Sequence, residues 1–206
     1  MGNAAREAKV AIHAYGLATG EVRMLASPEN SSGLADLMQG IGRRYVPWFN
    51  SKYGCIGSPW DGRFRSAAIE ADSCFLSCLR YVESHGANNL SSEVGNEPPW
   101  SLPSSAAHHQ GSGSDELVID HPAFWALGNT PFERQAAYGR LLDRPVSKDE
   151  TAAISCAALN GWALGSETFM TLVGTRCGRR AERATPGRRP KRVELAPTIV
   201  MSPFKA

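Results

Sequence analysis

Aromatic and basic side chains are interleaved in one stretch of the sequence, residues 43–66. Aromatic rings can stack on unpaired nucleic-acid bases while guanidinium groups hold phosphates, and single-strand binding proteins combine the two. The alternative is that the rings belong to a hydrophobic core and that the arginines are merely exposed. The residues concerned are Arg43, Arg44, Tyr45, Trp48, Phe49, Trp60, Arg63, Phe64 and Arg65.

A second basic region lies near the end of the chain. Residues 176–192 carry a net charge of +7 with a single acid, Glu182, so the remainder carries −5 within the overall +2. A basic segment that contains Pro and Gly suits binding to a phosphate backbone, and the alternative is a solvated tail without a partner. We expect a nucleic-acid partner and a disordered tail over 176–206. The basic residues are Arg176, Arg179, Arg180, Arg183, Arg188, Arg189, Lys191 and Arg192.

The composition is that of a globular protein, with 42% hydrophobic and 20% charged residues among 206. No apolar run is long enough for a membrane span, and the first residues lack a signal-peptide core, so we expect a cytoplasmic protein with no membrane partner. The cysteines are odd in number and scattered, which favours buried thiols over a metal site or disulfides. They are Cys55, Cys74, Cys78, Cys156 and Cys177.

The first half of the chain predicts a small sheet with helices. Strands are expected at 10–18 and 22–27, joined by a turn that uses the freedom of Gly20. Apolar residues at helical spacing predict a helix over 34–50, and residues 64–69 predict a strand.

A second helix follows and carries a tyrosine of interest. Asp72 or Ser73 is expected to cap its start, and Gly86 its end. Tyr81 lies beside the apolar stripe of this helix, a position that by itself assigns it no function.

The second half of the chain predicts a polar loop and then short helices. In the loop, residues 86–122, His108 and His109 are expected to be solvated. His13, on the first strand, is expected to be a histidine with satisfied hydrogen bonds, either in the core or at the surface. Two capping boxes predict helices, and we expect a third helix before Gly174. The helices are 130–143, 147–159 and 166–173, and the expected units are 1–100, a loop over 101–125, a helical region over 126–175 and the tail over 176–206.

Several motifs together resemble the single-strand DNA transposases that use one catalytic tyrosine (HUH type), and in particular their relatives, the REP-associated tyrosine transposases. The most specific are Trp-Asp-Gly-Arg-Phe-Arg-Ser at 60–66 and Gly-Trp-Ala-Leu-Gly-Ser at 161–166. The others are Gly-Arg-Arg-Tyr at 42–45, Phe-Asn at 49–50, Arg-Tyr-Val-Glu at 80–83 and Pro-Trp-Ser at 99–101. The resemblance covers most of residues 10–192.

The resemblance implies an α+β fold, with an antiparallel ferredoxin-like or RRM-like sheet flanked by helices, then a small helical C-terminal region and a basic tail. It implies DNA transposition, in which a tyrosine attacks a phosphodiester of single-stranded DNA and becomes linked to the 5′ side. It also implies a divalent metal, Mg²⁺ or Mn²⁺, held by a His-hydrophobic-His pair on a strand. A further strand and most of a helix would precede Met1, so residues 1–100 are expected to form an N-terminally incomplete domain.

Carried over residue by residue, the resemblance makes Tyr81 the nucleophile. Glu21 and Arg23 stand where the two histidines are expected, and His85 stands where related enzymes place a third ligand. Glu21 and His85 are therefore the candidate metal ligands. Arg23 cannot ligate a cation, because a guanidinium is always charged and has no acceptor.

Three hypotheses follow for this chain. It is an active transposase, a relative that binds single-stranded or hairpin DNA with impaired catalysis, or a decayed fragment. The altered metal motif favours the second. A homodimer remains open. The DNA-binding residues are expected to be Arg43, Arg44, Arg63, Arg65, Arg179, Arg180, Arg188, Arg189, Lys191 and Arg192.

Overall fold

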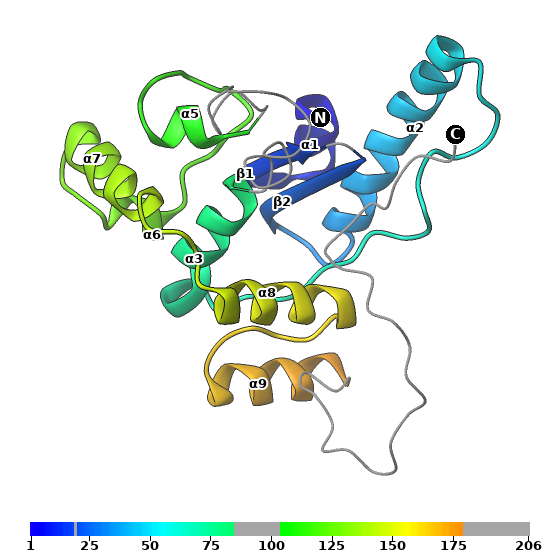
Figure 1. The fold of residues 1–206 in the computed structure, drawn as a ribbon. Helices are drawn as coiled ribbons and strands as arrows, with labels where there is room; N and C mark the ends of the chain where they lie inside the picture. The colour runs from blue at the N-terminus through cyan, green and yellow to red at the C-terminus, as the bar shows by residue number, and fades with distance from the viewer. Residues whose placement is uncertain (19, 85–103, 179–206) are drawn as a thin grey trace.

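The computed structural model describes residues 1–18, 20–84 and 104–178, and shows an α+β fold (Figure 1). The α+β class expected from the sequence is confirmed, while the ferredoxin-like topology stays a prediction. In chain order the elements are α1 (Gly2–Ala8), β1 (Val10–Ala18), β2 (Glu21–Pro28), α2 (Gly33–Tyr53), α3 (Ala71–Glu83), α5 (Ala106–His109), α6 (Pro122–Trp125), α7 (Pro131–Leu142), α8 (Lys148–Asn160) and α9 (Glu167–Cys177).

The two expected strands form an antiparallel sheet, β1 with β2. Gly20, with φ of 77°, supplies the left-handed conformation that the turn between them requires. The pairing register shifts between Ile12 and Ala14, which leaves His13 as the extra residue of a bulge. On its other side, β1 accepts two further backbone bonds, from Ile119 N to Ile12 O at 2.8 Å and from Ser105 N to Tyr15 O at 3.0 Å.

The bulge places His13 in the interior. His13 is 5% exposed, so the core alternative expected from the sequence is confirmed. Its Nδ1 donates to the carbonyl of Ile119 at 2.6 Å, and its Nε2 accepts from the hydroxyl of Ser27 at 3.0 Å. Burial lowers the pKa of His13, so the imidazole is neutral near neutral pH.

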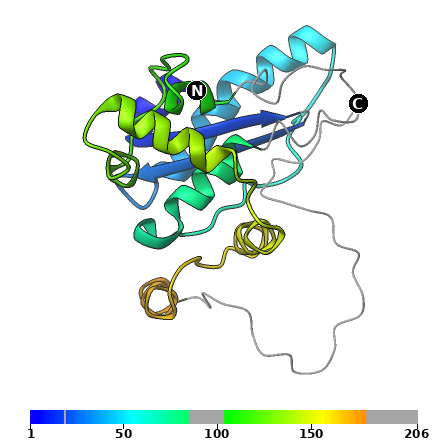
Figure 2. The ribbon, with the colours of Figure 1, turned by 60° about the vertical axis from the view of Figure 1, so that its left-hand side comes forward.

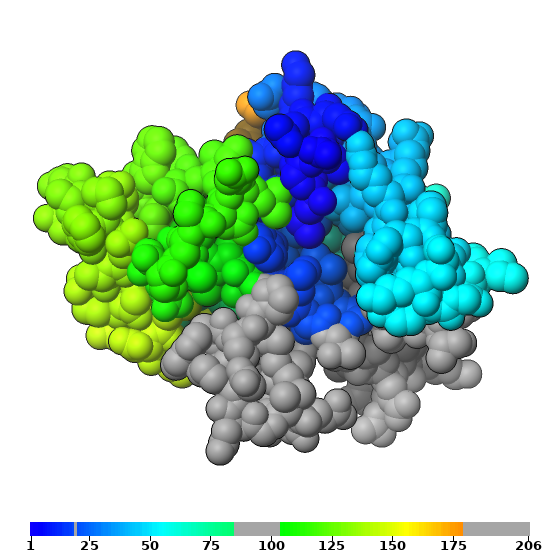
Figure 3. Space-filling model, turned by 90° about the horizontal axis from the view of Figure 1, so that it is seen from above, coloured from blue at the N-terminus to red at the C-terminus, as the bar shows by residue number. Residues whose placement is uncertain are grey.

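Helices cover both faces of the sheet (Figure 2). On one face, α1 and α2 pack on β1 through a cluster that includes Ala5, Ile12 and Leu37. On the other face, α3 packs on both strands through Phe75 and Leu79. Seen from above, α1 lies between the α2 lobe and the α5–α7 region (Figure 3).

α2 is longer than expected, and its last turns leave the body of the protein. It continues to Tyr53 and ends where Gly54 adopts a left-handed conformation with φ of 66°. Buried residues near its start, such as Leu37, hold it on the sheet. The far end projects away from the sheet (Figure 1).

The start of α3 differs from the expectation. Neither Asp72 nor Ser73 caps it; the N-cap residue is Glu70, without a capping side-chain bond. The carboxylate of Glu70 instead accepts from the hydroxyls of Ser73 and Ser166 and from the amide of Ser166, which ties α3 to the start of α9. The strand expected at 64–69 is reduced to a single bridge between Ile69 and Leu164.

The helices of the C-terminal region agree with the capping signals. Thr130 with Glu133, and Ser147 with Glu150, form the two expected capping boxes. α9 runs past Gly174 to Cys177, since a lone glycine only weakens a helix. None of the helices that the structure describes has the length and apolar character needed to cross a bilayer.

Candidate functional site

The end of α2 presents two large aromatic side chains to solvent. Trp48 is 51% exposed and Tyr53 is 56% exposed. The ammonium of Lys52 lies 4.9 Å from the centre of the Trp48 ring and 5.5 Å from that of Tyr53, within cation–π range of both. We call these three residues the α2-end surface. It combines two half-exposed rings with a positive charge.

Further aromatic residues adjoin the α2-end surface. The ring centre of Tyr45 lies 5.5 Å from that of Trp48 and 5.2 Å from that of Trp60, which comes from the loop after α2. Phe49 packs 4.6 Å from Tyr53 and is buried. The core alternative therefore holds for Phe49 and fails for Trp48.

Four of the arginines expected to bind DNA lie in the described part of the chain, and all four are exposed but differ in their contacts. Arg44 pairs with Glu7 at 2.7 Å, and Arg65 donates to the carbonyl of Leu159 on α8 at 2.9 Å. Arg43 lies on α2 five positions before Trp48, and Arg63 follows Trp60 in the loop. No ion pair links Arg43 or Arg63 to another described residue, so their charges are available to a ligand.

The remaining predicted basic residues lie outside the described part of the chain. They are Arg179, Arg180, Arg188, Arg189, Lys191 and Arg192, and the candidate metal ligand His85 lies outside it as well.

The candidate nucleophile Tyr81 lies inside the protein. It is 3% exposed, and its hydroxyl is 2.7 Å from that of Ser155 on α8. The guanidinium of Arg23 stacks over its ring at 4.3 Å. The structure therefore brings Tyr81, Arg23 and Glu21 together, but beneath other side chains.

The surroundings of Tyr81 do not fit a divalent cation. Glu21 is engaged by Arg23, whose Nε lies 2.8 Å from its carboxylate oxygen. Arg23, at 8% exposed, places a fixed positive charge where a metal ion would lie. Within residues 1–18, 20–84 and 104–178, no group of three or more His, Cys, Asp or Glu side chains could hold a metal ion.

The electrostatics of Tyr81 also disfavour a nucleophile. Burial raises the pKa of Tyr81, and the hydrogen bond with Ser155 and the charge of Arg23 oppose that shift only in part. The phenol is therefore protonated near neutral pH, and a protonated phenol is a weak nucleophile without a base or a metal to activate it.

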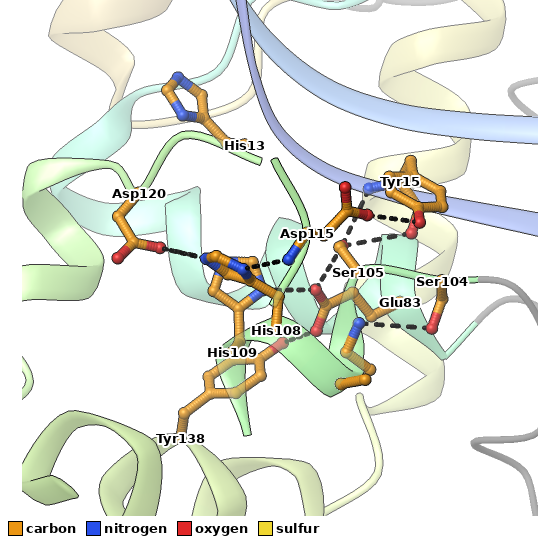
Figure 4. A network of polar contacts seen from close by, with 12 residues as sticks. His13, Tyr15, Glu83, Ser104, Ser105, His108, His109, Asp115, Asp120 and Tyr138 are labelled. Atoms are coloured by element: carbon orange, nitrogen blue, oxygen red, sulfur yellow. Dashed lines mark hydrogen bonds and ion pairs between the residues drawn. The ribbon is translucent and has the colours of Figure 1, made fainter. Parts of the chain in front are cut away.

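Two residues beyond Tyr81, α3 carries a buried acid at the centre of a polar network (Figure 4). The carboxylate of Glu83 accepts from Ser105 Oγ at 2.5 Å, from His109 Nδ1 at 2.6 Å and from the hydroxyl of Tyr138. The side chains of Glu83 and His109 are 0% and 1% exposed. The network fastens the segment after residue 103 and α7 onto α3.

The network extends from His109 toward the surface. The other ring nitrogen of His109 lies 3.7 Å from Asp120 Oδ1, and Nε2 of His108 lies 3.4 Å from the same oxygen. Asp115 donates its amide to His108 Nδ1 and accepts from the Tyr15 hydroxyl. The expectation that both histidines are solvated is therefore wrong, because tertiary contacts enclose this loop.

This arrangement is not a nucleophilic triad. In a triad the hydroxyl bonds to the imidazole and the carboxylate holds the other ring nitrogen. Here Ser105 and His109 both donate to the same carboxylate, and Ser105 is 1% exposed. We interpret the contacts of Ser105, His109 and Tyr138 with Glu83 as a buried anchor in which the carboxylate satisfies three donors.

The sequence did not lead us to predict a role for Glu83, at the centre of the network, or for Ser155, beside Tyr81. Glu83 lies four positions after Leu79, so an acid falls on the apolar stripe of the helix; that signal was available. Ser155 gives no signal, because a lone serine in a helix is unremarkable and only tertiary packing brings it to Tyr81.

A scan of this chain against protein-family models, a search of curated proteins and a search of solved structures each find no match.

Proposed function

We propose that this chain is a single-stranded DNA-binding protein of the DNA-transposition class, in which tyrosine-mediated cleavage is impaired. The observation that carries the proposal is the α2-end surface, where Trp48 and Tyr53 are half exposed on either side of the Lys52 ammonium. Unpaired bases stack on such rings, and each stacked base contributes about 1–3 kcal/mol.

Charge near the rings supports a nucleic-acid ligand over an apolar one. Arg43 and Arg63 are exposed on the same part of the chain, on α2 and on the loop that Trp60 ties to Tyr45. A phosphate backbone that passes the rings would meet these guanidinium groups. The basic residues after 178 would add electrostatic affinity that carries no sequence information.

Impaired catalysis is proposed from the chemistry around Tyr81. The phenol is buried, its pKa is raised, and the Glu21–Arg23 pair stands in place of neutral metal ligands. Tyr81 is 3% exposed and its hydroxyl is held by Ser155 of α8, so DNA would have to displace this contact to reach it. Binding and cleavage are therefore proposed to be separated in this chain.

The first experiment measures binding of the full chain to a fluorescent single-stranded oligonucleotide, with the duplex of the same sequence as competitor. The proposal expects salt-sensitive binding in which the single strand competes more strongly than the duplex, because only unpaired bases can stack on the rings. Equal competition, or no binding by folded protein, would contradict it.

A second experiment tests catalysis. The protein is incubated with a labelled hairpin DNA, with and without Mg²⁺ or Mn²⁺, and run on a denaturing gel beside the Tyr81→Phe variant. We expect no covalent adduct. A metal-dependent adduct that disappears in Tyr81→Phe would identify an active transposase and overturn the impaired-catalysis part alone.

A further inference from the structure

An apolar cavity of about 580 Å³ runs along the outer side of β2. Leu37 of α2 lines it on one side, and Phe75 of α3 and Ile154 of α8 line it on the other. β2 supplies Met24 and Leu25 to the lining. A space of this size is unusual in a well-packed interior, whereas apolar pockets of roughly 300–1,000 Å³ are typical ligand sites.

β2 borders this cavity and has the sequence of a strand that is covered on both faces. Apart from Arg23, residues 22–26 are all apolar, a run typical of strands buried on both sides. Leu25 packs on the hydrophobic cluster of α3, while Met24 and Ala26 pack on that of α1 and α2. A further strand beside β2 would therefore be enclosed by the same two helical layers.

The pairing register shows which backbone groups of β2 face the cavity. In an antiparallel pair, alternate residues bond to the partner strand, and the residues between them point their amides and carbonyls to the other edge. Tyr15, the partner of Met24, directs its amide and carbonyl away from β2, to Ser105. Met24, and with it Val22, therefore points these groups to the outer edge, where no hydrogen bond between described residues uses them.

The opposite wall of the cavity presents a second strand edge. Residues 64–69 line the cavity, and Ile69 forms a parallel bridge with Leu164. Leu164 donates to Ala68 O and accepts from Glu70 N, both at 2.8 Å. Because backbone groups alternate along an extended segment, those of Ile69 point away from Leu164, and no hydrogen bond between described residues uses them.

We propose that the cavity binds an extended apolar peptide of a partner protein, which adds as a strand between β2 and residues 64–69. Unpaired amides and carbonyls beside an apolar space require hydrogen-bond partners, and a peptide backbone supplies both kinds where a lipid chain supplies neither. About five residues would span the 17 Å or so from Val22 to Ala26. Their side chains would alternate between the layers of Leu37 and Phe75, so β-branched apolar residues suit both sets.

This site is separate from the proposed DNA-binding surface. α2 contributes to the cavity with its first turns, through Leu34, Leu37 and Met38, and to the α2-end surface with its last ones. Loss of Trp48 and Tyr53 should therefore leave peptide binding unchanged, whether or not the chain binds DNA.

The test measures binding of the full chain to a fluorescein-labelled peptide, Lys-Lys-Val-Ile-Val-Ile-Val-Lys-Lys, by fluorescence anisotropy. The matched control peptide has the same side chains but is methylated on the five central backbone nitrogens. We expect the control to bind roughly a hundredfold more weakly, because it has lost the amides that pair with the two strand edges. Equal affinity for the two peptides would overturn the proposal in favour of a simple apolar-ligand site.

Two pairs of protein variants locate the binding site. Ala157→Leu on α8 fills the cavity and should abolish binding, while Ala153→Leu, on the exposed face of the same helix, should not. Val22→Pro removes an amide of the outer edge, spares the ladder with β1, and should weaken binding more than Val22→Ala does.

Urea denaturation of each variant shows that it is folded. Absence of binding by the wild type, or unchanged affinity in folded Ala157→Leu and Val22→Pro, would overturn the proposal. A wild-type dimer in gel filtration that Ala157→Leu converts to a monomer would overturn it as well, because the occupant would then be a second copy.

Discussion

α2 and α3 both carry aromatic residues that the sequence singles out, and they present them in opposite ways. On α2, Trp48 and Tyr53 are about half exposed and bracket a lysine. On α3, Tyr81 is 3% exposed beneath Arg23 and against Ser155. One helix end presents its rings to solvent, while the other helix is part of the core.

The contrast shows that residue type alone does not decide the role of a tyrosine. Tyr81 lies on the face of α3 that packs on the sheet and on α8, so burial raises its pKa and shields it from substrate. Tyr53 lies on the last turn of α2, beyond the part of the helix that the sheet covers. The position of each residue in the fold therefore decides that Tyr81 is buried and Tyr53 is exposed.

The largest expected effect is a loss of stability when the buried acid of α3 is removed. Glu83→Ala removes a carboxylate that accepts three hydrogen bonds and leaves buried donors without a partner. We expect a loss of about 3–5 kcal/mol in the free energy of unfolding, measured by urea denaturation. Glu7→Ala, which breaks an exposed pair with Arg44, should cost at most about 1 kcal/mol. Equal losses would show that the network is not an anchor.

A smaller effect is expected at the exposed helix end. Arg43→Ala should weaken binding to single-stranded DNA and reduce the slope of log affinity against log salt by about 0.7, the value for one phosphate contact on a single strand. Arg140→Ala, an exposed arginine on α7, is the matched control and should leave the slope unchanged. An unchanged slope in Arg43→Ala would place the phosphates elsewhere.

Tyr81→Phe tests whether the tyrosine of α3 contributes to stability and not to DNA binding. The variant keeps the ring beneath Arg23 but loses the hydrogen bond with Ser155, so we expect a loss of about 0.5–1.5 kcal/mol in stability. Its affinity for single-stranded DNA should equal that of the wild type. A clear fall in affinity with stability unchanged would mean that DNA reaches this tyrosine.

A separate prediction concerns alkaline pH. Burial raises the pKa of Cys78 from 9.0 to about 12 in the folded protein. A raised pKa favours the protonated thiol, so its contribution to stability is complete below the unfolded pKa and is lost as pH rises from about 9 to about 12. Between about pH 8 and about pH 11, Cys78→Ala should therefore lose less stability than the wild type.

Much of the fold could be predicted, because its signals are local. The strand pair follows from two apolar runs around Gly20, and the capping boxes at Thr130 and Ser147 locate two helices. The short α1 was not predicted. Its alanines become buried only through α2 and β1, and seven residues are too few to show a clear period.

The candidate site was predictable in composition but not in exposure. The interleaving of rings and arginines was visible in the sequence, yet nothing there separates Trp48, which is exposed, from Phe49, which is buried. The enclosure of His109 depends on Glu83, 26 positions earlier, and on Tyr138. Contacts of this kind are set by tertiary packing and leave no local pattern.

The most direct test of the central claim is the affinity of the full chain for single-stranded DNA after loss of the two exposed rings. In the Trp48→Ala, Tyr53→Ala double variant we expect affinity to fall by tenfold or more, since each stacked base contributes about 1–3 kcal/mol. Phe132→Ala removes a ring that is 83% exposed on α7 and should leave affinity unchanged. If the double variant, still folded, bound as tightly as Phe132→Ala, the α2-end surface would not be the DNA-binding site.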